Sequence, residues 1–172
     1  VNYSVNGVAQ TPVTGAGLGV TPLGPFAANA EVSVTVGNGA SGCTANLGNY
    51  YSNCPVTIAC GSPSLVVNYC YRNDDTKTWT FLNDTPGETI TVTFVSGAMA
   101  PGDVIRFYDG TDNTGLQLAG SNYPDLTGLS VTTSIGVSAM FIEVESIGSG
   151  SCADGDPAAS PWQFEVECTA GC

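Results

Sequence analysis

The sequence predicts an all-β protein, an antiparallel β-sandwich, and three observations carry that prediction. Short runs in which β-branched or aromatic residues alternate with polar ones recur along the chain. Glycine and proline, 22 and 10 of the 172 residues, separate these runs at short intervals. No window of a dozen residues keeps an apolar stripe of helical period. At 42% hydrophobic residues, the chain is also too apolar to be disordered.

Two segments show the strand pattern most clearly. In 89–95, the side chains of Ile90, Val92 and Phe94 point one way and two threonines the other. In 139–145, apolar residues share one face and two glutamates the opposite one. This alternation predicts half-buried strands whose outer face contacts water. The seven predicted strands are 31–36, 78–82, 89–95, 104–108, 129–134, 139–145 and 162–167.

The composition changes near residue 62, and this predicts two modules. Residues 1–62 hold a single acidic residue, Glu31, whereas 63–172 hold all three cations, both tryptophans and the other acids. A free-standing sandwich usually needs about 100 residues, so the first segment is short for one. We expect it to be a partial immunoglobulin-like segment or a strand-bearing extension that packs on a neighbour. The chain starts at Val1 without a charged-then-apolar leader, and we expect it to be part of a longer array.

The charge balance argues against several functions. Fifteen acidic and three basic residues give a net charge of −12, which opposes binding to nucleic acid and to anionic membranes. No apolar run approaches the roughly 20 residues of a membrane span, so we expect no membrane insertion. The chain has no histidine, the commonest general base and metal ligand. We therefore expect a protein that is not an enzyme.

Acidic pairs and an acidic loop have ordinary structural explanations. Glu143 with Glu145, and Glu165 with Glu167, stand two apart on predicted strands and share a solvated face, unlike carboxyls that flank a glycosidic bond. The loop 109–115 falls between two strand patterns and lacks the twelfth-position glutamate of an EF-hand. We expect a hairpin turn there.

Seven cysteines predict a disulfide framework, and hence a secreted, cell-surface or extracellular location. The candidate disulfide cysteines are Cys43, Cys54, Cys60, Cys70, Cys152 and Cys168. We expect each to pair with its neighbour in the sequence (43 with 54, 60 with 70, 152 with 168), although other connectivities stay open. Cys172 would then be unpaired or intermolecular.

From Tyr69 onward, the order of motifs resembles a CUB domain, an extracellular β-sandwich of jelly-roll topology. The most telling parts are Asp103-Val-Ile-Arg-Phe-Tyr-Asp-Gly110 and the closing Pro161-Trp-Gln-Phe-Glu-Val-Glu-Cys168. The stretches 69–75, 78–81 and 90–94 and a leucine-bearing strand (Leu116, Leu118) precede or separate them in the expected order. The resemblance covers about residues 63–172 and implies a CUB-like jelly roll.

The first segment is similar to immunoglobulin-like repeats of very large bacterial surface proteins. Tyr3 to Gly7 would open a hairpin, and the strand Val32 to Val36 would lead into a cysteine-bearing turn. Arrays of such repeats with CUB-like modules between them are typical of secreted adhesins of gliding and surface-colonising bacteria. The resemblance therefore implies an adhesin.

Calcium is the one cofactor that the CUB resemblance implies. Calcium-binding members use an early Glu, an Asp ahead of the Tyr-Asp-Gly strand and an Asp before the last strand. Asp103 matches the middle ligand and Asp154 or Asp156 the third, while Asp74 or Asp75 would have to replace the missing Glu. Five loop carboxylates could together supply oxygens to Ca²⁺. Asp-Gly-Asp-Pro is equally an ordinary turn sequence, so both interpretations stay open.

The aromatic residues divide into two groups. Trp79 and Trp162 each share a strand face with a phenylalanine two residues on, and we expect both to anchor the core. Tyr50, Tyr51 and Tyr123 are expected in loops, where they could bind a ligand.

Three functions of different classes follow. The first is a non-enzymatic, extracellular structural or adhesive module of a bacterial surface protein or filament, which assembles with copies of itself or with neighbouring repeats through its β edges. The second is a calcium-dependent module that recognises a glycan or a surface protein. The third is an accessory domain of a secreted hydrolase. We rank them in that order.

Overall fold

The computed structural model describes residues 1–6, 8–15, 20–27, 30–38, 43–51 and 54–169, and for 38, 43, 44, 46 and 48–51 it describes the backbone alone. These residues form strands, turns and loops, so the predicted all-β class is confirmed. Nowhere in those ranges is there a helix long and apolar enough to cross a lipid bilayer. The chain divides into two compact units, unit 1 (Val1–Cys54) and unit 2 (Pro55–Cys172), and each is described by itself.

The boundary lies between Cys54 and Pro55 rather than after residue 62. The short strand β5 (Val56–Ile58) pairs in parallel with β7 (Thr78–Asn83) and so belongs to unit 2. Ile58 is buried in the core of that unit. The composition places the boundary too late because, apart from Glu31, the charged residues begin only at Arg72, so the uncharged β5 looks like part of the first segment.

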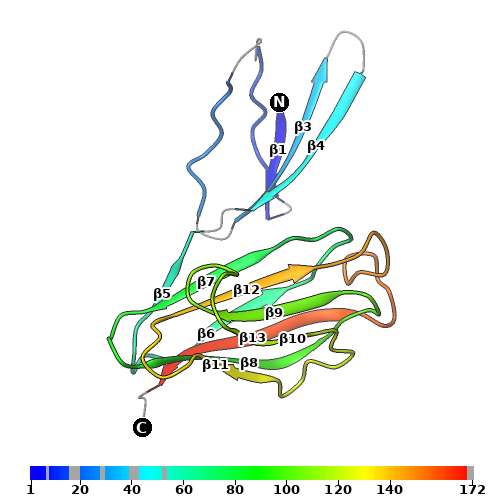
Figure 1. The fold of residues 1–172 in the computed structure, drawn as a ribbon. Coiled ribbons are helices and arrows are strands. Elements are labelled where there is room, and N and C mark those ends of the chain that lie inside the picture. The colour runs from blue at the N-terminus through cyan, green and yellow to red at the C-terminus, as the bar shows by residue number, and fades with distance from the viewer. Residues whose placement is uncertain (7, 16–19, 28–29, 39–42, 52–53, 170–172) are drawn as a thin grey trace. The chain divides into compact units, whose positions relative to one another are not determined.

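Unit 1 is one antiparallel sheet with the strand order β2-β1-β3-β4 (Figure 1). Its strands are β1 (Asn2–Val5), β2 (Val8–Ala9), β3 (Glu31–Asn38) and β4 (Cys43–Tyr51). The pairing of Val5 with Val8 makes the predicted hairpin, and Asn6 before its glycine adopts a left-handed φ of 49°. Ala30, Val32 and Val34 alternate into the buried side.

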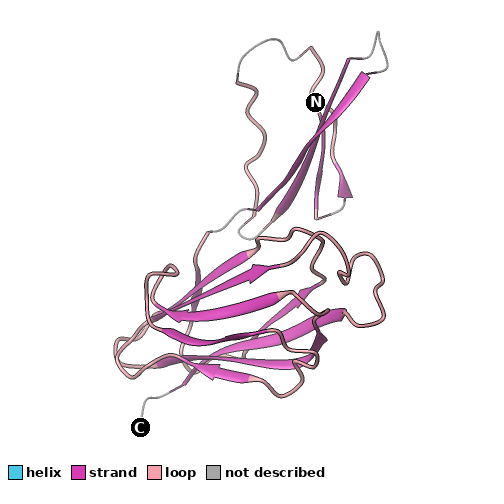
Figure 2. Ribbon diagram, turned by 45° about the vertical axis from the view of Figure 1, so that its right-hand side comes forward, coloured by secondary structure: helices cyan, strands magenta, loops and turns pink. Residues whose placement is uncertain are grey.

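Unit 2 is a sandwich of two sheets that lie face to face (Figures 1 and 2). The five-stranded sheet has the order β10-β9-β12-β7-β5, and the four-stranded sheet β11-β8-β13-β6. All neighbours are antiparallel except β5 and β7. The remaining bounds are β6 (Leu65–Tyr69), β8 (Thr89–Ala98), β9 (Val104–Asp109), β10 (Gln117–Ser121), β11 (Ser130–Thr132), β12 (Ala139–Glu145) and β13 (Ser160–Thr169).

The core of unit 2 is aromatic, as the sequence predicts. Trp79 and Phe164 meet edge to face with ring centres 5.6 Å apart, and Phe94 lies 5.0 Å from Phe164. Trp162 is buried beside them and donates its indole N–H to the carbonyl of Ala98. Burying one such large side chain stabilises the fold by about 1.5–3 kcal/mol. The tryptophans therefore hold the two sheets together.

All seven predicted strands occur, with the predicted faces. Ile90, Val92 and Phe94 are buried while Thr91 and Thr93 reach the outer side. Three strands were not predicted: β4, β5 and β6. Strand β5 has only three residues, β4 is rich in Asn and Gly, and β6 (Leu-Val-Val-Asn-Tyr) begins with three apolar residues in a row, so none shows the alternation on which the other predictions depend.

The predicted pairing of sequence neighbours is wrong for four of the cysteines. Cys60 bonds to Cys168, and Cys70 bonds to Cys152. Cys60 and Cys70 lie before and after β6, and Cys152 and Cys168 stand at opposite ends of the segment that contains β13. Because β6 and β13 run antiparallel as neighbours, each end of one lies beside the opposite end of the other. The side chain of Cys43 and the whole of Cys172 lie outside the described residues, so the pairing of 43 with 54 and the fate of Cys172 stay predictions.

Candidate functional site

The five predicted aspartates lie in three connections of unit 2 that meet one another. Asp74 and Asp75 follow β6, Asp103 ends the turn before β9, and Asp154 and Asp156 lie between β12 and β13. The disulfide from Cys70 to Cys152 ties the first of these connections to the third. The sequence order alone does not show this meeting, which the antiparallel pairing of the strands produces.

Asp75 is buried and holds the chain between β6 and β7 in place. Its carboxylate accepts hydrogen bonds from the Tyr69 hydroxyl at 2.5 Å and from the backbone N–H groups of Arg72 and Lys77 at 3.0 Å each. Its own N–H donates to the Ser146 hydroxyl at 2.7 Å. A carboxylate with three donors around it is a structural brace, with little capacity left for a metal ion.

Asp103 is fully buried, and its two oxygens differ. Oδ1 accepts a hydrogen bond from the N–H of Ile147 at 2.9 Å. Oδ2 is buried and has no hydrogen-bond partner. The turn that carries the residue is fixed by Asn122, whose amide donates to the carbonyls of Ala100 and Asp103 at 2.6 and 2.9 Å. A buried carboxylate oxygen without a donor is costly unless a cation or another donor approaches it.

Asp74 reaches the same loop as Asp103. Its N–H donates to the carbonyl of Ile147 at 3.1 Å, and its φ of 54° turns the chain there. A side chain at Gly148 would meet the Asp74 carboxylate at 3.4 Å. The backbone at 147 and 148 thus lies against the carboxylates of both Asp74 and Asp103.

The other two aspartates are engaged in a turn of their own. Asp154 accepts a hydrogen bond from the side-chain amide of Asn73, and Asp156 accepts one from the N–H of Ala158 at 2.7 Å. The N–H of Asp156 donates to the carbonyl of Ser151 at 3.3 Å. The Asp-Gly-Asp-Pro segment therefore forms the ordinary turn that was one of its two interpretations.

Tyr71 is buried at the end of the sandwich where the aspartates lie. Its side chain is fully buried, and its hydroxyl accepts a hydrogen bond from the N–H of Ala100 at 2.8 Å. Burial raises the pKa of the hydroxyl well above its ordinary value, and the nearby carboxylate of Asp103 raises it further. Tyr71, Asp75 and Asp103 are thus shielded from water, whereas Asp74 and Asp154 are exposed.

The five aspartates do not gather into one cluster in the part of the chain that the structure describes. No three His, Cys, Asp or Glu side chains in the described ranges stand together so that they could hold a metal ion. Two carboxylates, those of Asp103 and Asp74, lie against one loop, and Asp103 is fully buried with the Tyr71 hydroxyl beside its carboxylate. Calcium needs six to eight oxygens, so the rest would come from backbone carbonyls and water. Calcium binding by these residues therefore stays a prediction.

Of the three tyrosines expected in loops, Tyr123 lies in one. Tyr50 and Tyr51 belong to the end of β4, a strand and not a loop, and their side chains lie outside the described residues. Tyr123 does lie in a loop, but it is half-buried and packs against the core of unit 2. The binding role of Tyr123 stays a prediction.

The acidic strand pairs lie on solvated faces, and one is neutralised in part. Arg106 Nη1 lies 2.8 Å from Glu145 and 3.4 Å from Glu143. Tyr108 donates to Glu143 at 2.9 Å. The hydrogen bond that Arg106 donates to Glu145, with charge attraction from both glutamates, raises the pKa of Arg106 above its ordinary value. Asp109 closes the hairpin from β9 to β10 by donating its N–H to the carbonyl of Leu116, so the predicted turn is confirmed.

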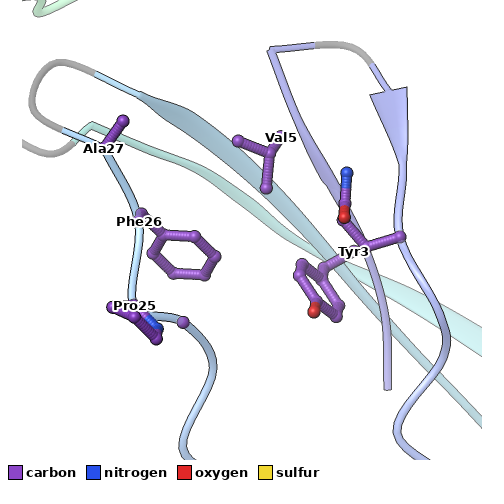
Figure 3. A pocket seen from close by; sticks show the side chains of 7 residues that line it. Tyr3, Val5, Pro25, Phe26 and Ala27 are labelled. Carbon is purple, nitrogen blue, oxygen red and sulfur yellow. The ribbon is translucent and has the colours of Figure 1, made fainter.

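Unit 1 contains a pocket of about 280 Å³ that the sequence does not reveal. Figure 3 shows Phe26, on the connection before β3, facing Tyr3 and Val5 of β1. The rings of Tyr3 and Phe26 meet edge to face with centres 6.2 Å apart. Gln10 and Pro25 complete the lining, together with Gly24 and Ala27. The pocket is mainly apolar, and its only sequence signal is the Gly-Pro-Phe turn.

No protein-family model and no curated protein matches the sequence. Solved structures do show similarity. The extracellular region of zebrafish Gpr126/Adgrg6 is 16% identical with a TM-score of 0.47, over 69% of this chain and 15% of that one. The CUB1-EGF-CUB2 fragment of rat MASP-1 is 12% identical with a TM-score of 0.48, over 67% and 42%. A periplasmic inhibitor of g-type lysozyme, PliG of Aeromonas hydrophila, is 13% identical with a TM-score of 0.36, over 67% and 96%.

The matched regions make up less than half of the first two of these structures. Two disulfides indicate an oxidising compartment outside the cytosol for this chain. The chain is therefore an extracellular-type β-sandwich module stapled by disulfides, with a second, single-sheet unit before it.

Proposed function

We propose that the chain is a non-enzymatic structural or adhesive module of a bacterial surface protein or filament, and that it assembles with copies of itself or with neighbouring repeats through its β edges. The observation that carries the proposal is a pair of open, uncharged strand edges. In unit 1 the nine-residue β4 ends the sheet, and in unit 2 β6 ends the four-stranded sheet. Unpaired strand edges are templates for another chain.

The charge distribution supports the same proposal. The first 71 residues carry one charged side chain, Glu31, although the chain has a net charge of −12. Natural edges that stay monomeric are usually protected by charges, prolines or short length. Neither β4 nor β6 holds a charged residue or a proline. Both edges can therefore approach a second copy without direct charge repulsion.

Light scattering on native, non-reduced protein tests this proposal. We expect particles much heavier than the 17.5 kDa chain, with a mass that grows with protein concentration. Unfolded material is excluded by confirming β-rich circular dichroism in the same sample. A particle mass of one chain at every concentration would overturn the proposal.

One observation favours a second function, calcium-dependent recognition of a glycan or protein. The buried Oδ2 of Asp103 has no hydrogen-bond partner, and the Asp74 carboxylate lies against the same loop. With calcium bound, the ion would neutralise both carboxylates and fix the loop, which would present a rigid surface to a ligand.

Melting curves with EDTA and with added Ca²⁺ test the second function. Calcium should raise the melting temperature of the wild type, because it binds only the folded chain. Asp103→Asn should remove that rise, and Asp154→Asn, whose carboxylate is already held by Asn73, should keep it. An unchanged melting temperature of the wild type would refute calcium binding.

A further inference from the structure

Strand β6 (Leu65–Tyr69) differs from the other edges of the sandwich. It pairs with β13 over all five residues without a shift of register. Leu65 and Val66 are 37% and 47% exposed. Val66 and Asn68 stand on the outer face, while Val67 packs inward against the core.

The other three edges of unit 2 are blunted by familiar means. Strands β5 and β11 have three residues each. Strand β10 carries a register shift between Gln117 and Ala119, so its edge is not regular. In unit 1, β4 is longer, but its pairing with β3 also shifts register. Short length and bulges are the usual protections against pairing with another chain, and β6 has neither.

We infer that β6 pairs antiparallel with the β6 of a second copy of this chain, so that the two four-stranded sheets join into one continuous sheet. The inference rests on the proposed function and names the edge and the partner. A two-fold axis at Val67 places Val67 opposite its own copy, and Val66 opposite Asn68 of the partner. None of these pairs involves a charge, and two-fold dimers are the commonest symmetric assembly.

A second copy suits this edge because of where the charges lie. The stretch from residue 32 to residue 71 contains no charged side chain, so neither copy brings one to the contact. The rest of each chain carries the net charge of −12, which repels at long range. Salt screens that repulsion and leaves the uncharged contact intact, so the dimer should tighten as salt is raised. Weaker association at high salt would contradict an uncharged contact.

Lysines on the two outward positions of β6 test the pairing. In Val66→Lys/Asn68→Lys, each lysine would face a lysine of the partner, and we expect association to weaken about tenfold. The matched control, Thr91→Lys/Thr93→Lys, adds the same charge to the outer face of β8, an interior strand of the same sheet. Its association should match the wild type in sedimentation equilibrium, with folding checked by circular dichroism.

The outcomes separate this inference from the proposed function. If the wild type associates and the β6 lysines leave association unchanged, assembly uses another edge; the proposed function then stands and the β6 pairing is wrong. If the wild type is a single chain at every concentration, both are wrong. If both lysine variants weaken association equally, the effect is not specific to β6 and the pairing is wrong.

A cysteine at the symmetry position tests the register directly. Residues directly opposite in an antiparallel pair have Cα atoms about 4.5–5.5 Å apart, a distance that a disulfide spans. Val67→Cys should therefore yield a covalent dimer on mild oxidation, visible on a non-reducing gel. Val66→Cys, offset from its own copy along the strand, should not. Equal cross-linking of the two variants, or none in the first, would overturn the register.

Discussion

The disulfide between Cys70 and Cys152 should be among the largest single contributions to the stability of unit 2. It closes a loop with a sequence separation of 82 residues. Removing the cross-link in Cys70→Ser/Cys152→Ser frees that loop in the unfolded chain, and the loss of chain-entropy restraint is about 4.5 kcal/mol. The bond between Cys60 and Cys168, with a separation of 108 residues, should be worth about 4.8 kcal/mol by the same reasoning.

Urea unfolding of the non-reduced protein, followed by tryptophan fluorescence, measures these losses. Both tryptophans lie in unit 2, so the signal reports this unit alone. If Cys60 instead paired with Cys70 and Cys152 with Cys168, each double variant would break both bonds, and the summed loss would be about 5.8 kcal/mol. Losses below about 3 kcal/mol for both double variants would refute the entropic argument behind the magnitude, and equal losses of about 5.8 kcal/mol would refute the long-range connectivity.

Two further predictions concern the stability of unit 2, one at Gly97 and one at the buried hydroxyl of Tyr71. Gly97 has a φ of 143°, and an added Cβ would lie 2.7 Å from the Trp162 ring. Gly97→Ala should therefore lower the free energy of unfolding by about 3 kcal/mol. Gly110→Ala, with a positive φ but open space, should cost only about 1 kcal/mol in the same urea titration; equal losses would show that the ring contact is unimportant. Tyr71→Phe removes the acceptor of the Ala100 N–H and should cost about 1–3 kcal/mol at pH 7. Because burial raises the pKa of Tyr71 above its ordinary 10.0, its contribution is complete below pH 10 and is lost as the pH rises through the folded-state pKa. Between pH 8 and 11, the free energy of unfolding should thus fall less steeply with pH for Tyr71→Phe than for the wild type. Identical slopes of this free energy against pH would contradict the raised pKa.

The strands that could be predicted are those whose side chains show their environment in the sequence. Ile90, Val92 and Phe94 alternate with threonines because one face of β8 is dry and the other wet. Strand β5 has three residues, too few for such a pattern, and its place beside β7 depends on a parallel pairing with distant residues. The predicted module boundary falls too late because β5, like the residues before it apart from Glu31, holds no charged side chain.

The candidate site was predicted in its residues but not in their roles. All five aspartates do lie where three connections meet. Asp75 and Asp103 are both buried, yet one is surrounded by donors and the other keeps a free oxygen. That difference comes from Tyr69 and from the backbone at Ile147, which no local pattern places near an aspartate.

The sequence by itself determined the all-β class, the seven main strands, the aromatic core and the oxidising compartment, because each depends on composition or on a period of two residues. Only the tertiary structure decided which cysteines bond, which carboxylate keeps an unpaired oxygen and which strand edge stays open. Those properties depend on contacts between residues far apart in the chain. In the antiparallel pair of β6 and β13, the start of one strand meets the end of the other, and that single arrangement joins Cys60 to Cys168 and leaves the far edge of β6 exposed.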